Sequence, residues 1–226
     1  MIKTILKVMA AAIGLSFGVA HAGFITVGGV PAGADGQKNP FGFCTIDFNA
    51  SNATNPCGAT YTGQVASNFP TGSNNVHASP AGDTTAYLTV GPTEGGPITV
   101  TLGTKANYFG FFTGSLDSYN LVQFFLGATQ VDQFTGTDIN AIAFGGVPTG
   151  DRTQSAYVNY FSTNPGGQQV LFDRIVYSSS QNAFETDNHA FGVQRIPVPE
   201  PGSLALLGLG AVGLFASRRR KSVAAK

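Results

Sequence analysis

The sequence of 226 residues contains no tryptophan, only two cysteines and three histidines, and few charged side chains. No histidine pair has the spacing of a zinc site, and no Ser, His and Asp set can be argued for a catalytic triad. Basic residues are scarce between residues 23 and 196, where five stand against eleven acids, a net charge near −6. No basic stripe is present to neutralise phosphates, so this composition argues against nucleic-acid binding.

The start of the sequence has the layout of an export signal. Two lysines precede an apolar run over residues 8–20, and an Ala-His-Ala site ends at Ala22. A positive stretch, a short apolar run and a small-residue cleavage site together are typical of a secretory signal peptide. We therefore predict a signal peptide over residues 1–22, removed by signal peptidase so that the mature chain begins at Gly23.

Three unlike features follow one another at the other end of the sequence. A Pro-Glu-Pro triplet, an uncharged apolar run and a basic cluster stand in that order; they are Pro199, Glu200 and Pro201, residues 203–217, and Arg218, Arg219, Arg220 and Lys221. The prolines keep the triplet extended, so a helix begins only after it. A 15-residue helix spans about 22 Å, against a hydrocarbon core of roughly 30 Å. We predict a short transmembrane helix over 203–217, oriented by the basic membrane-stop cluster.

This order resembles the PEP-CTERM sorting signal of exported bacterial proteins, and residues 198–203 match that pattern residue for residue. We assign residues 197–226 to the signal. The resemblance implies that an exosortase-like enzyme recognises the triplet and processes the tail, with transient anchoring in the inner membrane. The alternative is an ordinary C-terminal membrane anchor with a proline-rich neck.

Residues 23–196 are expected to form one domain. Short apolar runs, of which 98–102 alternates most clearly, are separated by Gly and Pro turns, which is typical of strands. The last such runs are 184–187 and 190–196, and helical periodicity is confined to about 138–144. The 18 Phe and 7 Tyr suit inward-facing strand positions. We predict an all-β, jelly-roll-like β-sandwich, flanked by the signal peptide and the C-terminal apolar helix.

Two segments of this domain, 108–120 and 184–192, are similar to strand-loop motifs common in PEP-CTERM surface proteins. This looser similarity implies a sandwich of the carbohydrate-binding-module type without enzymatic activity.

Cys44 and Cys57 are the only cysteines of a chain expected to be exported, which favours a disulfide. Closing a loop of about a dozen residues would stabilise the fold by roughly 3 kcal/mol in the chain-entropy model. The alternatives are two free thiols or a metal pair without further partners.

Two groups of polar residues are candidate ligand sites. Asp117, Tyr119 and Asn120 follow an aromatic run, and polar groups beside aromatic rings suit sugar binding. The alternative is a packed hairpin end with Tyr119 in the core.

The second group is Glu185, Asp187 and Asn188, whose oxygens suit Ca²⁺. The alternative is turn chemistry, with Glu185 paired to Arg174. Calcium is the one cofactor that we expect.

We predict a non-enzymatic protein of the bacterial cell surface or extracellular matrix with a structural or adhesive role, and the resemblance to PEP-CTERM proteins implies that this role is in an exopolysaccharide matrix. The alternative is a carbohydrate-binding module assisted by calcium, and a third hypothesis is a secreted hydrolase. The expected partners are signal peptidase, an exosortase-like enzyme and polysaccharide.

Overall fold

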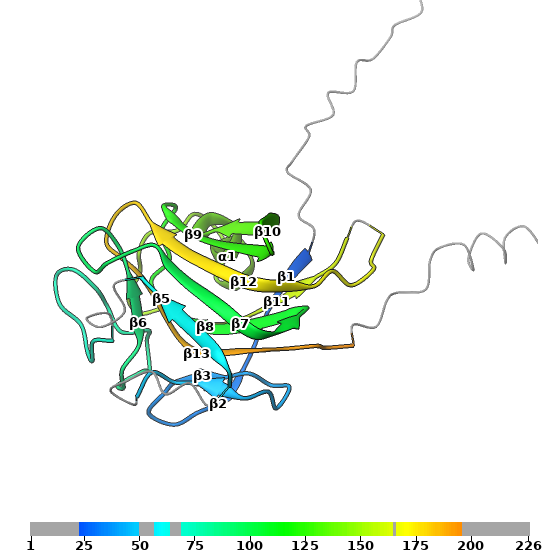
Figure 1. The fold of residues 1–226 in the computed structure, drawn as a ribbon. Coiled ribbons are helices and arrows are strands. Elements are labelled where there is room, and N and C mark those ends of the chain that lie inside the picture. Colours follow the sequence, from blue (N-terminus) through cyan, green and yellow to red (C-terminus); the bar gives the residue numbers. More distant parts are fainter. Residues whose placement is uncertain (1–22, 50–56, 64–68, 165, 196–226) are drawn as a thin grey trace, which may run out of the picture.

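The computed structural model describes residues 23–49, 57–63, 69–164 and 166–195. These residues form two facing β-sheets with one short helix, which confirms the all-β prediction (Figure 1). The predicted signal peptide, the Pro-Glu-Pro triplet, the helix over 203–217 and the basic cluster all lie outside the described residues. Within the described ranges, no helix is long and apolar enough to cross a membrane.

The first sheet has six strands, which are β1 (Gly23–Val27), β11 (Ala156–Ser162), β8 (Tyr108–Thr113), β13 (Phe184–Gly192), β4 (Thr45–Ile46) and β6 (Leu88–Val90). The second sheet has five, which are β10 (Thr129–Thr135), β9 (Asn120–Leu126), β12 (Phe172–Ser179), β7 (Ile98–Ala106) and β5 (Ala59–Thr62). A small hairpin pairs β2 (Val30–Pro31) with β3 (Gln37–Lys38), and helix α1 (Gly136–Ala143) follows β10.

The eight strands from β6 to β13 pair in a nested order. Strand β9 pairs with β10, β8 with β11, β7 with β12, and β6 with β13, each time antiparallel. Two further antiparallel pairings, β8 with β13 and β9 with β12, complete the sheets. Each sheet therefore joins strands that are distant in the sequence.

Aromatic side chains from both sheets fill the space between them. Phe124 of the second sheet stacks on Tyr160 of the first, with ring centroids 3.9 Å apart, and Phe109 meets Phe124 at 6.1 Å. Tyr177 meets Phe109 at 6.4 Å and is itself fully buried. Burying each ring contributes roughly 1.5–3 kcal/mol, so this aromatic interior is the main source of stability.

Strand β13 buries both of its faces. Phe184 and Phe191 belong to the aromatic interior, whereas Glu185 and Asp187 alternate with them and point to the outer face of the first sheet, the face turned away from the second sheet. The pairing with β8 shifts between Asp187 and Ala190, so a β-bulge interrupts the alternation there.

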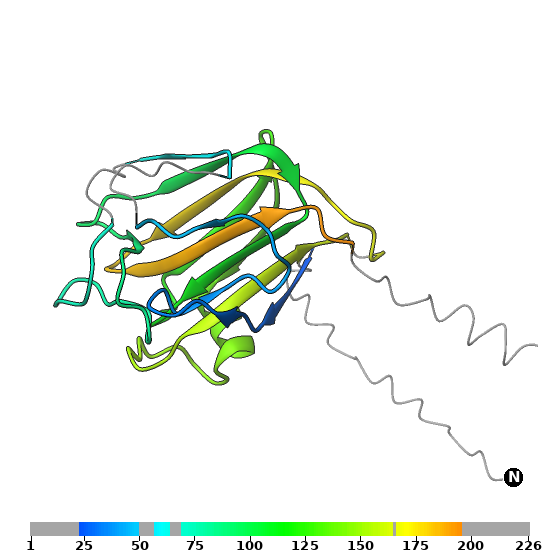
Figure 2. The ribbon, with the colours of Figure 1, turned by 90° about the horizontal axis from the view of Figure 1, so that it is seen from below.

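Loop segments cover this outer face. Figure 2 shows the N-terminal segment (blue) crossing the sheet that contains β13 (orange). Asn159 of β11 donates from Nδ2 to the Gly28 carbonyl at 2.9 Å. A Cβ at Gly36 would overlap the Phe112 ring, and Gly36 has a φ of 70°. Glycine at this position therefore allows the segment to lie flat on the strands.

The predicted disulfide is present and joins the margins of the two sheets. Cys44 and Cys57 are bonded, with Cα atoms 5.5 Å apart. Cys44 directly precedes β4 of the first sheet, and Cys57 lies just before β5 of the second. The bond therefore ties together two peripheral strands with few pairing residues of their own.

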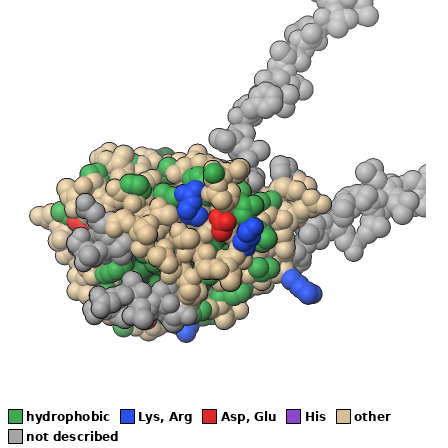
Figure 3. Space-filling view, in the orientation of Figure 1, with side chains coloured by type: hydrophobic (Ala, Val, Ile, Leu, Met, Phe, Trp, Pro, Cys, Tyr) green, Lys and Arg blue, Asp and Glu red, His purple; other side chains and the backbone are tan. Residues whose placement is uncertain are grey.

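Both ends of the described body lie at one end of the first sheet. Gly23 pairs with Ser162, and Gly192 pairs with Tyr108 on the neighbouring part of the same sheet. We call this the terminal pole. The opposite, or loop, pole carries the connections 91–97, 114–119, 144–155 and 180–183. On the face shown in Figure 3, charged side chains are few and scattered among uncharged ones.

Candidate functional site

Three acids meet on the covered outer face of the first sheet, and we call Asp83, Glu185 and Asp187 the acid cluster. Their exposed fractions are 5%, 2% and 0%. The two β13 acids are brought there by strand alternation, and Asp83 is carried in by the loop that precedes β6. Burying carboxylates is costly unless each is protonated, hydrogen-bonded or paired with a cation.

Glu185 is satisfied by two donors from neighbouring loops. The Ala78 backbone N–H donates to Glu185 Oε1 at 2.8 Å, and Ser115 Oγ donates to Oε2 at 3.4 Å. Burial nevertheless raises the pKa of Glu185 to about 7, and the donors only partly offset it. Glu185 therefore fastens two loops to the sheet.

Asp187 and Asp83 differ from Glu185 because some of their carboxylate oxygens lack a well-aligned donor. Both side-chain oxygens of Asp187 and Oδ2 of Asp83 are buried without a hydrogen-bond partner. Burial raises the pKa of Asp187 to about 10, and the nearby Asp83 carboxylate adds to the rise. The pKa of Asp83 is also raised by burial.

Asp35 lies beside this pair and opens onto the surface. It forms an antiparallel bridge with Asp83, and its carbonyl accepts from Asn188 Nδ2 at 2.6 Å. An open pocket of about 370 Å³ begins here, lined by Ala32, Asp35, Lys38, Phe43, Thr45, Asp47 and Asn188. The acid pair is thus buried next to a polar, solvent-connected hollow.

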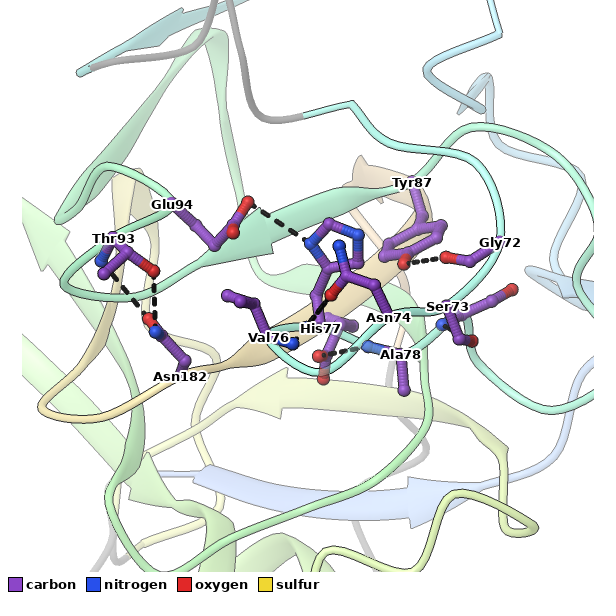
Figure 4. A network of polar contacts seen from close by, with 12 residues as sticks. Gly72, Ser73, Asn74, Val76, His77, Ala78, Tyr87, Thr93, Glu94 and Asn182 are labelled. Carbon is purple, nitrogen blue, oxygen red and sulfur yellow. Dashed lines mark hydrogen bonds and ion pairs between the residues drawn. The ribbon is translucent and has the colours of Figure 1, made fainter.

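A network of polar contacts in the loop from 72 to 78 covers the Glu185 end of the cluster (Figure 4). Asn74 Oδ1 accepts from the His77 N–H at 2.9 Å, and His77 Nδ1 lies 3.3 Å from Glu94 Oε2. Tyr87 donates its hydroxyl to the Gly72 carbonyl at 2.5 Å. These contacts shape the loop so that the next residue, Ala78, can donate to Glu185.

The predicted sugar-binding residues are engaged within the protein. Asn120 is buried; its Oδ1 accepts from the Asp117 N–H at 2.7 Å, and its Nδ2 donates to Ser179 and Ala183. Tyr119 donates its hydroxyl to the Asn182 carbonyl at 3.2 Å, and burial raises its pKa to about 12. The structure places Asp117 and Tyr119 in the β8–β9 connection and Asn120 at the start of β9, where Tyr119 and Asn120 bond to the 179–183 segment.

The predicted calcium residues do not converge on one point. Glu185 is held by Ala78 and Ser115, and Asn188 donates from Nδ2 to the Asp35 carbonyl, whereas both buried oxygens of Asp187 lack a well-aligned donor. Among the described residues, no three His, Cys, Asp or Glu side chains are grouped as a metal site.

The alternative that we considered for Glu185, a pairing with Arg174, is not formed. Arg174 lies on β12 of the other sheet, where its guanidinium stacks over Phe125 at 4.0 Å and donates to the Gly127 carbonyl. The sheet topology therefore separates the two charges.

Sequence reasoning missed Asp83 and Asp35, which sit in stretches without periodicity. A local cue was available for Asp83, because Asp-Thr-Thr at 83–85 is an Asx-turn sequence. The structure has that turn, with the Thr85 N–H and hydroxyl donating to Asp83 Oδ1 at 2.8 and 2.7 Å. No local cue, however, pairs Asp83 with Asp35 or Asp187.

Comparison with known proteins bears on the tail and not on the acid cluster. Residues 197–221 match a protein family described as the PEP-CTERM protein-sorting motif. Searches of curated proteins and of solved structures gave no match. The match agrees with the order of triplet, apolar run and basic cluster in the sequence. The chain therefore carries a PEP-CTERM protein-sorting motif, which implies exosortase-dependent sorting and export toward the cell surface.

Proposed function

We propose that this protein is a non-enzymatic β-sandwich with a structural or adhesive role at the cell surface or in the extracellular matrix. The observation that carries the proposal is the sorting motif at residues 197–221, which follows closely after the last strand, β13. The disulfide between Cys44 and Cys57 supports an oxidising destination. The burial of Asp83 and Asp187 also supports a non-enzymatic role, because a large substrate cannot reach these two carboxyl groups.

The two poles suggest how the domain is presented. Signal peptidase and an exosortase-like enzyme would both act on segments that adjoin the terminal pole, where Gly23 and Gly192 lie. The loop pole would then face away from the membrane during processing. Under this proposal the loops 91–97, 114–119 and 180–183 are the first parts to meet matrix components.

We further propose that the sandwich is a jelly roll. An eight-stranded chain rolled up as two Greek keys joins its first strand to its eighth, its second to its seventh, and so on inward. The nested pairings from β6–β13 to β9–β10 follow this scheme. Strands β1, β4 and β5 are additions at the margins of the two sheets.

Mass spectrometry of the protein recovered from its native cells tests the sorting proposal. The expected product begins near Gly23 and ends near Ser203, and it is found in the surface or matrix fraction. Glu200→Ala in the triplet should leave the tail intact and retain the protein in the inner membrane. Glu94→Gln, far from the tail in sequence, is the matched control. An intact tail on the wild-type protein would favour a plain anchor and contradict the proposal.

Carbohydrate binding is a second candidate, and exposed aromatic rings near the terminal pole favour it. Phe24 and Phe41 are each 40% exposed. Phe24 stacks on Phe161 at 5.0 Å, and Phe41 packs edge-on against Tyr108 at 5.0 Å. Partly exposed rings fixed by other rings can stack against sugars.

Sedimentation with insoluble matrix polysaccharide tests this candidate. Phe41→Ala should lower the bound fraction, and Val147→Ala, at a residue 80% exposed on another part of the surface, should not. Asp117→Ala tests the site predicted from the sequence. Equal retention of all variants would leave the structural role as the better explanation.

A further inference from the structure

The donors around Asp83 reach only one of its two carboxylate oxygens. Oδ1 accepts from the Thr85 N–H and hydroxyl, at 2.8 and 2.7 Å. The main chain of the same turn is also fixed, because the Asp83 N–H donates to the Pro80 carbonyl at 2.9 Å and Ser79 donates to the Asp83 carbonyl. Oδ2 is therefore held in one orientation, buried and without a donor.

Asp187 meets this oxygen from the strand side. It is 0% exposed, and neither of its carboxylate oxygens has a well-aligned hydrogen-bond donor, although the Asn188 N–H lies beside the group. The next residue, Asn188, has a φ of 51°. The Asn188 carbonyl accepts a hydrogen bond from the Tyr157 hydroxyl at 3.0 Å. The bulged strand thus fixes the position of Asp187 as firmly as the turn fixes Asp83.

A shared proton does not satisfy this arrangement. One proton between two carboxyl groups forms a single O–H···O bond, which uses two oxygens. Three oxygens lack a well-aligned donor here, two on Asp187 and one on Asp83, so a shared proton leaves one of them with only the poorly aligned N–H of Asn188 beside it. A cation, by contrast, accepts coordination from all three at once.

The surroundings can supply the further oxygens that a hard cation needs. Asp35 is bridged to Asp83 by its backbone, and its Oδ1 is held by Asn49 Nδ2 at 2.8 Å. The adjoining open pocket is lined by Asp35, Asp47 and Asn188, so it brings solvent as far as the residue next to Asp187. Ca²⁺ takes six to eight oxygen ligands and commonly completes its shell with water and carbonyls.

We propose that a divalent cation of the calcium type binds between Asp83 Oδ2 and the Asp187 carboxylate and clamps the covering loops onto β13. Of the three residues that the sequence suggested for calcium, only Asp187 belongs to this site. The clamp would join three distant segments, because Asp35, Asp83 and Asp187 come from the N-terminal segment, the loop before β6, and the last strand. The inference does not depend on the proposed surface role, although extracellular modules bind calcium with dissociation constants of about 10⁻⁴–10⁻³ M.

Thermal unfolding of the full chain in detergent, with and without calcium, tests the proposal. After EDTA treatment and exchange into buffer at pH 7.5, adding CaCl₂ to about 100 times the dissociation constant should raise the unfolding midpoint by roughly 5–10 °C. Asp187→Asn and Asp83→Asn should each abolish this shift. Glu94→Gln, an acid outside the cluster, should keep it.

Terbium luminescence gives a direct readout of binding that does not depend on stability. The chain has no tryptophan and 7 tyrosines, and Tyr157 contacts the residue next to Asp187, so tyrosine-sensitised Tb³⁺ emission should appear and be displaced by Ca²⁺. The Asp187→Asn protein should not give this emission.

Two outcomes would overturn the proposal. One is a wild-type protein whose midpoint and terbium emission do not respond to calcium, with Asp187→Asn at least as stable as wild type; the pair would then share a proton. The other is a calcium response that both Asp→Asn variants retain, which would place the cation elsewhere.

Discussion

The two faces of β13 are equally buried but are stabilised by different chemistry. On the inner face, Phe184 and Phe191 join an interior built from aromatic and aliphatic side chains. On the outer face, Glu185 and Asp187 lie under loops and depend on donors, protons or a cation. A polar stripe on a strand therefore does not have to face water. Here it is the attachment site for the segments that cover the sheet.

The comparison predicts that the inner face carries the largest single contributions to stability. Phe124 is fully buried and contacts Tyr160, Phe109 and Phe172. Phe124→Ala should lower the free energy of unfolding by about 3–5 kcal/mol, because it leaves a cavity between the sheets. Urea denaturation measures this loss.

Phe24→Ala, at a ring 40% exposed, is the matched control and should cost much less. The loss at Phe124 should be the same at every calcium concentration and from pH 5 to 9, since it packs on Phe109, Phe172 and Tyr160, and burial raises the pKa of Tyr160 further above its ordinary value. A loss that changed with calcium would mean that the two faces are coupled.

The disulfide should give the next largest effect, because it joins the margins of both sheets. Cys44→Ser together with Cys57→Ser should lower the free energy of unfolding by about 2–4 kcal/mol. Comparing the oxidised and reduced wild-type protein by urea denaturation checks the same quantity without a substitution. Identical stability under both conditions would contradict this account.

The outer face should make stability depend on pH when no cation is bound. The folded protein raises the pKa of Glu185 to about 7 and that of Asp187 to about 10, above their unfolded values near 4. The folded state then holds protons that the unfolded chain has already released. The stabilisation by these protons is therefore full below about pH 4 and falls as pH rises toward the folded-state pKa values, by about 1.4 kcal/mol per pH unit for each such proton.

The buried His189 has the opposite effect on stability at lower pH. Burial lowers the pKa of His189 to about 3, against an unfolded value near 6.5, so its contribution is lost as pH falls below 6.5. Two carboxyls outweigh this one histidine between pH 5 and 6.5, and above pH 7 the histidine no longer matters. The carboxylates of Asp83 and Asp35 face Asp187 and reinforce the trend.

Urea denaturation in EDTA from pH 5 to 9 measures this dependence. Asp187→Asn should flatten the curve, and saturating calcium should flatten it in the wild-type protein if the cation site exists. Phe124→Ala should shift the whole curve downward without changing its slope. A wild-type curve that rises from pH 5 to 9 would show that the acid cluster is ionised and satisfied in some other way.

Residues whose neighbours are set by strand alternation were predictable from the sequence, and residues brought together by loops were not. Alternation over 98–102 located β7, and a helix was expected about where α1 lies. The two short runs at 184–187 and 190–196 are in fact one strand, because the bulge at Asn188 breaks the alternation that the sequence shows.

The same reasoning explains the partial prediction of the site. Asp187 stood out because it lies on a strand near another acid. Asp83 and Asp35 are brought to it by a bridge between two irregular segments, and periodicity carries no information about such a pairing. Asn120 was a candidate sugar-binding residue, whereas in the structure its amide bonds to groups within the protein.

The smallest effect is expected at the edge of the outer face, where His77 meets Glu94. The two atoms are 3.3 Å apart, but His77 Nδ1 is not aligned for a hydrogen bond. Glu94→Gln keeps the size of the side chain and should change the free energy of unfolding by less than about 1 kcal/mol.

Urea denaturation of Glu94→Gln and of the wild type, each at low and at high salt, measures this contribution. A weak ion pair loses its contribution as salt screens it, so the variant and the wild type should converge at high salt. A loss of several kcal/mol would mean that this contact holds the 72–78 loop in place. In that case the hydrogen bond from the Ala78 N–H to Glu185 would depend on the contact between His77 and Glu94. The acid cluster would then extend to the loop pole.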